Sequence, residues 1–295
     1  MAVEEYFNVD ELYNEIFSVV YKKKLEELSR TEEENIRKNI LTLRESYLEK
    51  EPISIYDNGE IRKAYMLCYY PNYSKIIYEL MDKYIYNLVK NKSENFLSIT
   101  FLAAGPGAEI FGFIKYLSDK NYKKTLRIIA TDYEEGWKDE RKLTFKLIKN
   151  ITNLSINKIK NVVKCNLTLN CKLSCNLWNS CNKTVYKSDL IFMQNLLNHI
   201  GGNKEFYYNL QNKINLLKKG ALFIIVDLDY NISKSIIKRL CEEKSVKVIG
   251  TNIYGDIEKS TITLEENHII NKKIFRDNLI RKKNSRYYYA ILQKK

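Results

Sequence analysis

The sequence predicts an α/β protein with a doubly wound parallel sheet, preceded by an all-helical segment. From residue 96 onward, short apolar runs of strand type alternate with amphipathic runs of helical spacing. Such alternation is typical of a parallel sheet that is covered by helices on both faces. Residues 1–92 carry helical patterns throughout. We therefore expect a helical cap at 1–92, which would also form the substrate region, and a sheet domain at 93–295.

The helices of the cap are predicted from start signals and periodicity. Asn8-Val9-Asp10-Glu11 has the form of a capping box, and apolar residues recur after it at helical spacing. A second helix is expected from Thr31 to about Glu49. After a break at 52–59, two more helices are expected, divided at Tyr70-Pro71.

The sheet domain is expected to contain seven strands with helices between them. The strands are predicted at 97–103, 127–131, 161–167, 189–193, 221–227, 246–251 and 286–292, and the helices at 107–119, 135–151, 204–217 and 233–243. The last strand follows a stretch with weak helical signals, and we expect it to enter the sheet antiparallel.

The first predicted strand ends in a glycine turn, Ala103-Ala104-Gly105-Pro106-Gly107. Doubly wound sheets bind ligands beyond the carboxyl ends of their strands, where the strand order reverses. Gly105 and Gly107 let the backbone bend sharply and approach a ligand without a Cβ in the way. A dinucleotide fingerprint would place its third glycine where the chain has Ile110, and no P-loop pattern occurs. The turn therefore indicates another kind of ligand.

The second predicted strand ends in Asp132, 25 residues after Gly107. A carboxylate at this place can accept charge-assisted hydrogen bonds from both hydroxyls of a ribose. The glycine turn and this acid together favour a nucleoside ligand such as S-adenosylmethionine. A solvated aspartate after a strand remains the alternative explanation.

Residues 96–292 resemble the class I S-adenosylmethionine-dependent methyltransferases, whose first motif usually reads acid-x-G-x-G-x-G. Two positions depart from that motif, because Ala103 replaces the acid and Glu109 stands at the third glycine. "GPGAE" followed by "TDYEEGW" is similar, more narrowly, to a group that includes the fungal ribosomal-RNA uracil-N3 methyltransferases, with Trp137 as the counterpart of a tryptophan there. "CYYPNYSKI" is similar to a tyrosine-rich helical stretch in related proteins.

The resemblance implies a Rossmann-like seven-stranded methyltransferase sheet and a role for each of several residues. In it, Asp132 would hold the ribose, Tyr133 would lie against the adenine, and Asn166 would face the adenine amine. The expected sets are Ala103, Gly105, Gly107, Glu109, Asp132, Tyr133, Asn166 and Gln194 for the cofactor, Asn195 and His199 for catalysis, and Tyr70, Asn72 and Tyr73 for the acceptor. An ordinary strand-end turn is the alternative for Gln194 and Asn195, and a structural role is the alternative for His199.

Methyl transfer from a sulfonium needs alignment of the acceptor and exclusion of water more than covalent help. A general base is required only if the nucleophile carries a proton that must leave, and His199 is the nearest candidate. The N-P-P-[YF] signature and a Pro-Cys pair are both absent from the sequence. The acceptor atom is therefore left open.

The net charge of +13 favours an RNA acceptor, because clustered cations attract phosphates. The densest basic stretch is the tail, where phosphate contacts are expected from Arg276, Arg281, Lys282, Lys283 and Arg286. A solvated lysine-rich surface that reflects codon usage is the alternative. Two further function classes stay open: a methyltransferase for a small molecule or a protein, and a catalytically silent binding protein that keeps the fold.

Four cysteines, Cys165, Cys171, Cys175 and Cys181, follow the third predicted strand. Only the central pair has a spacing found in zinc knuckles, so we expect free thiols in an insert and no metal, and a tetrahedral zinc site formed by the four thiolates is the alternative. The chain shows neither a signal-peptide pattern nor an apolar run long enough to span a bilayer. We expect a soluble intracellular protein of the cytoplasm or nucleus, and the oligomeric state is not indicated.

Overall fold

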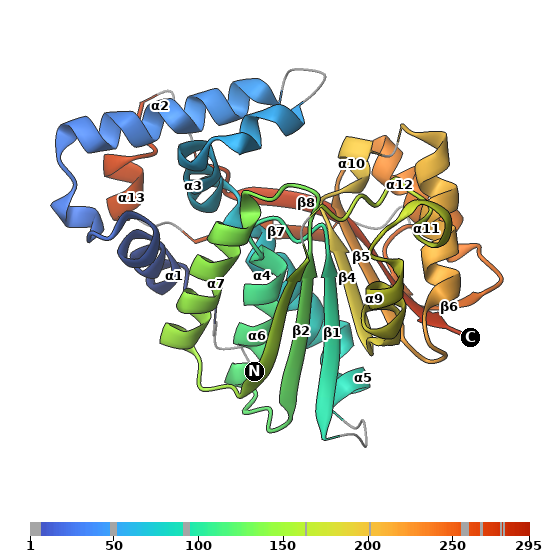
Figure 1. Ribbon diagram of the computed structural model, residues 1–295. Helices are drawn as coiled ribbons and strands as arrows, with labels where there is room; N and C mark the ends of the chain where they lie inside the picture. Colours follow the sequence, from blue (N-terminus) through green and yellow to red (C-terminus); the bar gives the residue numbers. More distant parts are fainter. Residues whose placement is uncertain are drawn as a thin grey trace.

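An eight-stranded mixed sheet forms the centre of the protein (Figure 1). The structure, a computed structural model, describes residues 7–47, 52–90, 95–162, 164–200, 202–254, 260–265, 268–277, 279 and 281–295. The strands are β1 Phe96–Leu102, β2 Thr125–Thr131, β3 Ile156–Val162, β4 Leu190–Gln194, β5 Leu222–Leu228, β6 Val246–Thr251, β7 Ser260–Thr263 and β8 Asn284–Lys294.

The strand order is β3-β2-β1-β4-β5-β8-β6, and β7 pairs with β8 outside this path. Strands β1 to β5 are parallel, whereas β8 runs antiparallel to β5, β6 and β7. The order reverses between β1 and β4, so the carboxyl ends of these two strands form the topological switch point. The predicted Rossmann-like fold class with an N-terminal helical region is confirmed, with eight strands instead of seven.

Helices cover both faces of the sheet. Those before β1 are α1 Val9–Ile16, α2 Arg30–Ser46, α3 Gly59–Cys68, α4 Tyr70–Leu80 and α5 Tyr86–Val89, with shorter turns at Phe17–Tyr21, Leu25–Glu27, Pro52–Asp57 and Met81–Ile85. Those after β1 are α6 Ala108–Asp119, α7 Trp137–Ile151, α8 Cys171–Ser174, α9 Trp178–Lys183, α10 Leu197–Ile200, α11 Lys204–Leu216, α12 Asn231–Cys241 and α13 His268–Lys273, with a 3-10 turn at Val185–Lys187.

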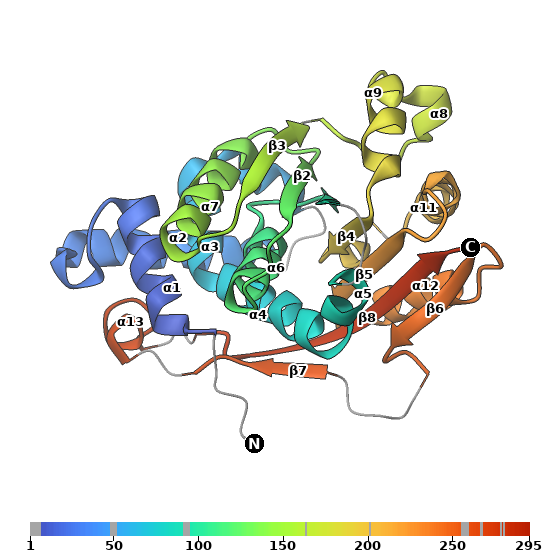
Figure 2. The same cartoon turned by 90° about the horizontal axis from the view of Figure 1, so that it is seen from below.

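The side chains of β5 show how the sheet divides two cores. Leu222, Ile224 and Val226 pack into the core that α1 to α4, α6 and α7 share. Phe223 and Ile225 point to the opposite face and pack with α10, α11 and α12. Figure 2 shows these two groups of helices on opposite sides of the strands. A strand that is apolar at consecutive positions is the pattern expected when both faces are buried.

Local start signals explain where several helices begin. Asn8 caps α1 by accepting a hydrogen bond from the Glu11 N–H at 3.0 Å, as the capping pattern predicted. Ser29 and Glu32 form a full capping box at the start of α2. The predicted division at Tyr70-Pro71 is confirmed, because α4 begins at Tyr70 and carries Pro71 in its first turn.

Strand β3 differs from its prediction, which placed it at 161–167. It occupies Ile156–Val162 at the edge of the sheet, where one side of the strand has no neighbour. The residues after it form a loop, in which the Cys165 N–H donates to the carbonyl of Asp132 at 2.8 Å. A polar edge strand lacks the continuous apolar run by which the inner strands were found.

The helical cap packs directly on the first helix of the sheet domain. Gly112 in α6 lies so close to α4 that an added Cβ would stand 2.1 Å from the Ser74 carbonyl oxygen. The Ser74 hydroxyl also donates to the Ala108 carbonyl at 2.9 Å. The contact therefore depends on the absence of a side chain at Gly112. The proposed division at residue 92 stays a prediction.

In the part of the chain that the structure describes, no helix combines the length and the apolar composition needed to cross a membrane.

We expect Gly112→Ala to lower the free energy of unfolding by about 1–3 kcal/mol, since α4 and α6 must separate to admit the methyl group. Urea unfolding of the purified protein measures the change. Gly59→Ala is the matched control, because its Cβ would meet only the Arg62 guanidinium at 3.5 Å, an ordinary contact. Equal midpoints for Gly112→Ala and wild type would contradict the close-contact explanation.

Candidate functional site

The turn after β1 holds three residues in left-handed backbone conformation within five positions. The φ angles are 52° at Ala103, 48° at Gly105 and 92° at Gly107. Glycine adopts this conformation at little cost, whereas alanine does so rarely. No atom lies within 4 Å of a Cβ built on Gly105, so the backbone there borders open space. The predicted glycine turn therefore lies at the switch point between β1 and β4, in the form that a close ligand contact requires.

Helix α7 and the cap brace this turn from behind. The Arg141 Nη1 group donates to the Gly105 carbonyl at 2.7 Å, and the Thr144 hydroxyl donates to the Pro106 carbonyl at 2.7 Å. The hydroxyls of Tyr70 and Thr144 are 3.0 Å apart. Arg141 is fully buried, and its Nη2 has no hydrogen-bond partner in the described structure. Sequence reasoning missed Arg141 and Thr144, which belong to an ordinary amphipathic helix pattern.

Asp132 stands at the end of β2 beside the turn and is 8% exposed. Its Oδ2 accepts the Gly105 N–H at 2.7 Å, and its Oδ1 accepts the Glu134 N–H at 2.9 Å. Burial raises the pKa of this carboxyl, while the Gly105 N–H and the charge of Arg141 act to lower it. Each carboxylate oxygen keeps a further lone-pair direction. Asp132 thus fixes the turn and retains capacity to accept hydrogen bonds from a ligand.

Glu109, the second residue of α6, is also buried beside the turn, with 5% exposure. The pKa of its carboxyl is raised to about 8, mainly by burial and to a smaller extent by the charge of Asp132, while Arg141 acts to lower it. Two carboxyl groups and one guanidinium therefore lie together behind the glycine turn. A buried carboxyl with a raised pKa is typical of a functional site.

The end of β4 contributes polar groups to the same edge. Gln194 donates from Nε2 to the Tyr73 carbonyl at 3.1 Å, and its Oε1 is buried without a partner in the described structure. Asn195 has a φ of 54°, and its buried Oδ1 is also without a partner there. Asp227 at the end of β5 accepts the Leu197 N–H at 2.7 Å, and burial raises its pKa to about 6. Asp227, like Asp132, comes at the end of an apolar run in the sequence. This signal, a carboxylate at a strand end, could have predicted Asp227 as well.

Six aromatic side chains gather over these strand ends. This aromatic cluster consists of Tyr47, Tyr56, Tyr65, Tyr69, Tyr73 and Trp137. The Tyr56 and Trp137 ring centroids are 4.9 Å apart, and the rings of Tyr69 and Tyr73 stack at 5.9 Å with an interplanar angle of 13°.

The aromatic cluster lies within electrostatic reach of the site carboxylates. Burial raises the pKa of Tyr56 to about 12, and the charge of Asp132 contributes to that rise. Burial raises the pKa of Tyr65 and of Tyr73 well above the usual value, with smaller contributions from Glu109 and Asp227 respectively. The aromatic cluster is thus a neutral, mainly apolar surface close to the carboxyl groups of Asp132, Glu109 and Asp227.

The other predicted site residues are distributed as follows. Tyr133 is 58% exposed beside Asp132. Asn166 accepts both the N–H and the hydroxyl of Thr168 with its side-chain oxygen, at 2.9 and 2.6 Å. His199 lies on the short helix α10, with its ring 6.3 Å from that of Tyr47.

The three residues predicted for the acceptor are all buried. Tyr70 turns its hydroxyl to Thr144, as described above. Asn72 donates from Nδ2 to the Lys282 carbonyl at 2.9 Å and is 0% exposed, so it ties α4 to the segment before β8. Tyr73 belongs to the aromatic cluster. The acceptor role of Tyr70 and Asn72 stays a prediction that these contacts do not favour.

The basic tail is partly used inside the protein. Arg281 is 3% exposed and donates from Nη2 to the Glu265 carbonyl, so its predicted role as a phosphate contact is wrong. Arg276 pairs with Glu34 at 2.5 Å. Lys282 is half-buried, and its Nζ lies 5.8 Å from the centroid of the Tyr69 ring. Burial lowers the pKa of this ammonium group.

The four cysteines of the insert are free thiols. Cys171 and Cys181 are buried, and the Tyr186 hydroxyl donates to the Cys171 sulfur at 3.1 Å. Over the described ranges, no group of three or more His, Cys, Asp or Glu residues is placed to hold a metal ion.

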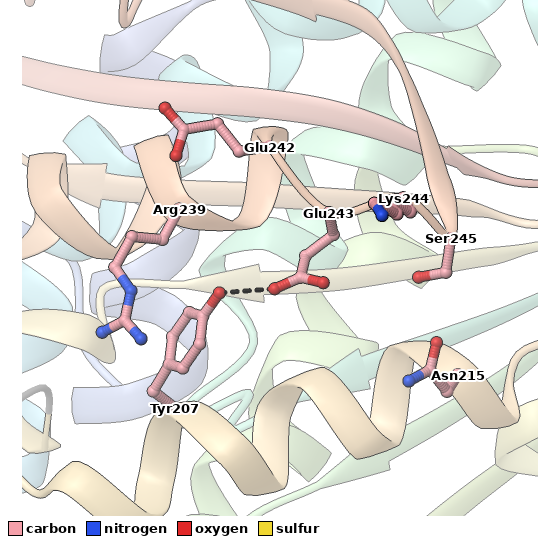
Figure 3. A pocket seen from close by; sticks show the side chains of 7 residues that line it. All are labelled: Tyr207, Asn215, Arg239, Glu242, Glu243, Lys244 and Ser245. Atoms are coloured by element: carbon pink, nitrogen blue, oxygen red, sulfur yellow. Dashed lines mark hydrogen bonds between the residues drawn. The ribbon is translucent and has the colours of Figure 1, made fainter.

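A hollow of about 450 Å³ lies elsewhere, between α11, the end of α12 and the start of β6 (Figure 3). Two of its charged groups contact the same tyrosine: the Tyr207 hydroxyl donates to Glu243 at 2.6 Å, and the Arg239 guanidinium lies 3.5 Å from the Tyr207 ring centroid. Because β6 is parallel to β1 and begins here, this hollow lies at the edge opposite the switch point. It is separate from the candidate site.

A scan against protein-family models finds no match to this chain, and neither does a search of curated proteins. Solved structures do match. They include an rRNA methylase from Streptococcus thermophilus, with 8% identity, a TM-score of 0.36, and coverage of 70% of this chain and 92% of the other. A precorrin-6y C5,15-methyltransferase from Geobacter metallireducens has 10% identity, a TM-score of 0.39, and coverage of 71% and 87%.

The CurJ carbon methyltransferase is a third match, with 10% identity, a TM-score of 0.44, and coverage of 82% of this chain and 60% of the other. These matches are all methyltransferases, at identities and TM-scores too low to transfer a function.

We expect Thr144→Val and Tyr70→Phe each to lower the free energy of unfolding by about 1–2 kcal/mol, because each leaves a buried polar group without its partner. The double variant should cost less than the sum of the two, since the shared hydrogen bond is lost only once. Urea unfolding of the four proteins gives the coupling. Strictly additive effects would show that the Tyr70 hydroxyl does not support the turn through Thr144.

Proposed function

We propose that this protein is an S-adenosylmethionine-dependent methyltransferase. The observation that carries the proposal is the turn with Ala103, Gly105 and Gly107 in left-handed conformation, fixed to Asp132 at the switch point of the sheet. A glycine turn of this kind lets the backbone approach a ligand without a Cβ in the way, and the acid on the neighbouring strand suits the hydroxyls of a ribose.

The polar groups present fit this cofactor. Arg141 Nη2, Gln194 Oε1 and Asn195 Oδ1 are buried without partners in the described structure, and all three belong to residues at this edge of the sheet. An uncompensated buried polar group is costly, so groups of this kind mark places where a polar ligand is accommodated. A nucleoside with an amino-acid end offers both donors and acceptors to them.

The residues that would hold the cofactor follow from their positions. The turn at Ala103, Gly105 and Gly107 would border the methionine part, Asp132 would accept the ribose hydroxyls, and the exposed ring of Tyr133 would cover the adenine. Asn166, on the loop after β3, and Gln194, the last residue of β4, would complete the cofactor site. When bound, S-adenosylmethionine supplies an electrophilic methyl group on a sulfonium.

The chain itself would align the acceptor and keep water out. The aromatic cluster supplies an apolar wall against which a planar acceptor can lie, and base–aromatic stacking stabilises such contacts by about 1–3 kcal/mol per base. Asn195, in left-handed conformation at the end of β4, has a buried amide oxygen without a partner in the described structure and would contact the acceptor. His199 would accept a proton only for an acceptor that loses one.

We propose RNA as the acceptor, with a base entering beside the aromatic cluster. Lys282 supports this, since it places an ammonium group at Tyr69 where a phosphate next to the base could be held. The net charge of +13 also attracts the phosphates of RNA to the protein. A small planar molecule is the second candidate, favoured by the burial of the aromatic rings. A silent binding protein would take up the cofactor without transferring its methyl group.

Calorimetry should show binding of S-adenosylmethionine to the wild type. Asp132→Asn should weaken it by about 1.5–3 kcal/mol, because charge-assisted hydrogen bonds to the ribose are lost. Asp139→Asn, on the exposed face of α7, is the matched control and should bind as the wild type does. Absence of heat with both the cofactor and its demethylated product would refute the cofactor assignment.

Affinity for a structured RNA should fall steeply with salt concentration, in proportion to the phosphates that the protein neutralises. Lys282→Gln should weaken RNA binding and flatten this dependence while leaving cofactor binding unchanged. Lys244→Gln, at the hollow on the opposite edge, should have no effect. Fluorescence anisotropy between 50 and 300 mM salt measures the RNA affinity and its salt dependence. RNA binding that does not depend on salt would favour a small molecule as the acceptor.

A further inference from the structure

The methyltransferase motif that this chain resembles carries an acid at the end of the first strand, and here that position is Ala103. The amino-acid end of S-adenosylmethionine carries an ammonium group close to a sulfonium. Its own carboxylate balances one of these two positive charges, so the cofactor brings a net charge of +1 into the site and needs a negative partner there, because an unpaired buried charge is strongly unfavourable. Some other group of this chain must therefore supply the charge.

Asp132 is engaged elsewhere. Each of its oxygens already accepts one backbone N–H, from Gly105 and from Glu134, and its remaining lone pairs suit the ribose. Exposed acids such as Glu135 lie on the solvent side of the loop, where water competes for the cation. This leaves the carboxyl groups that are buried behind the turn.

Glu109 has the required position, and the Arg141 guanidinium beside it forms no ion pair with it in the described structure. It stands two residues after Gly107, is 5% exposed, and receives a hydrogen bond from its own backbone N–H. In the described part of the chain, no lysine or arginine lies within 4.0 Å of its carboxyl oxygens. Arg141 is near enough to influence it but is bonded to Gly105 and Asn161.

The groups around Glu109 come from four elements. Asp132 faces it from the end of β2 and Arg141 from α7, while Tyr65 of α3 and Tyr70 of α4 are close enough to feel its charge. The tyrosines are neutral at physiological pH because burial raises their pKa well above the usual value. Burial raises the pKa of Glu109 to about 8, so at pH 7 the free protein keeps this carboxyl mostly protonated.

We propose that Glu109 is the counter-charge for the cofactor's α-ammonium group and releases its proton to solvent when the cofactor binds. The inference rests on the proposed function and adds to it a residue that replaces the missing strand-end acid. In the binding step, the carboxyl O–H bond breaks, the proton passes to water or buffer, and the carboxylate pairs with the ammonium. Binding therefore adds the charge of the cofactor to the site and removes the charge of one proton from it.

Proton release is measured by calorimetry at pH 7.0 in phosphate and in Tris, whose ionisation enthalpies differ. The wild type should release close to one proton per cofactor bound, and its affinity should rise as pH increases from 6.0 to 7.5. Glu109→Gln should bind the cofactor more weakly, with no buffer-dependent heat and no pH dependence in this range. Glu135→Gln should behave as the wild type does.

A truncated ligand separates this role from a structural one. 5′-Deoxy-5′-methylthioadenosine keeps the nucleoside and the sulfur but lacks the amino-acid end, so Glu109→Gln should leave its affinity unchanged. An equal loss of affinity for both ligands would overturn the proposal, as would buffer-independent heat with the wild type. If the wild type binds neither ligand, the proposed function itself fails, which is a different result.

The free protein provides a second measurement. The unfolded chain loses this proton near the usual pKa of glutamate, whereas the folded chain holds it up to about pH 8. Unfolding therefore releases a proton, and the stability of the wild type should decrease from pH 5 to pH 8 relative to Glu109→Gln. Parallel stability curves for the two proteins would show that the carboxyl is not buried in its protonated form.

Discussion

The site depends on the way Gly105 is held through both of its backbone polar groups. Its N–H donates to Asp132 at the end of β2, and its carbonyl accepts from Arg141 on α7. Backbone hydrogen bonds fix the residues on either side, from the Ala104 N–H to the Thr131 carbonyl and from the Gly107 N–H to the Ala104 carbonyl, whereas buried side chains satisfy the polar groups of Gly105. Because these side chains carry opposite charges, the turn is clamped between them. The elements that provide the clamp are those that a ligand at the switch point would contact.

The sequence predicted much of the fold because the inner strands are buried on both faces. Strands such as β5 appear as continuous apolar runs, which are readable without an alignment. The edge strand β3 was displaced in the prediction because it has no such run, and the short strand β7 was not predicted at all. Its four residues form a strand by pairing with β8, a partner distant in sequence. Tertiary pairing of this kind leaves little local signal.

The sequence predicted the parts of the candidate site that depend on backbone conformation. It did not predict the parts that depend on side chains brought together from distant elements. Gly105, Gly107 and Asp132 follow strands and could be found by position. Arg141 and Thr144 act from the buried face of a helix, and their pattern is that of any amphipathic helix. The aromatic cluster brings together tyrosines from the cap and Trp137 from α7, which no spacing rule connects. Charge was the least reliable guide, since Arg281 of the basic tail is an internal residue.

The position of β8 in the sheet means that the sheet cannot be completed until the last strand of the chain has been synthesised. This strand, at Asn284–Lys294, lies between β5 and β6 and carries the only described pairing partners of β6 and β7. During synthesis, β6 leaves the ribosome some forty residues before the strand that must separate it from β5. Until then the apolar edge of β5 is exposed and offers a template for wrong pairing. A chaperone that shields this edge would act in the interval before β8 is available to pair with β5.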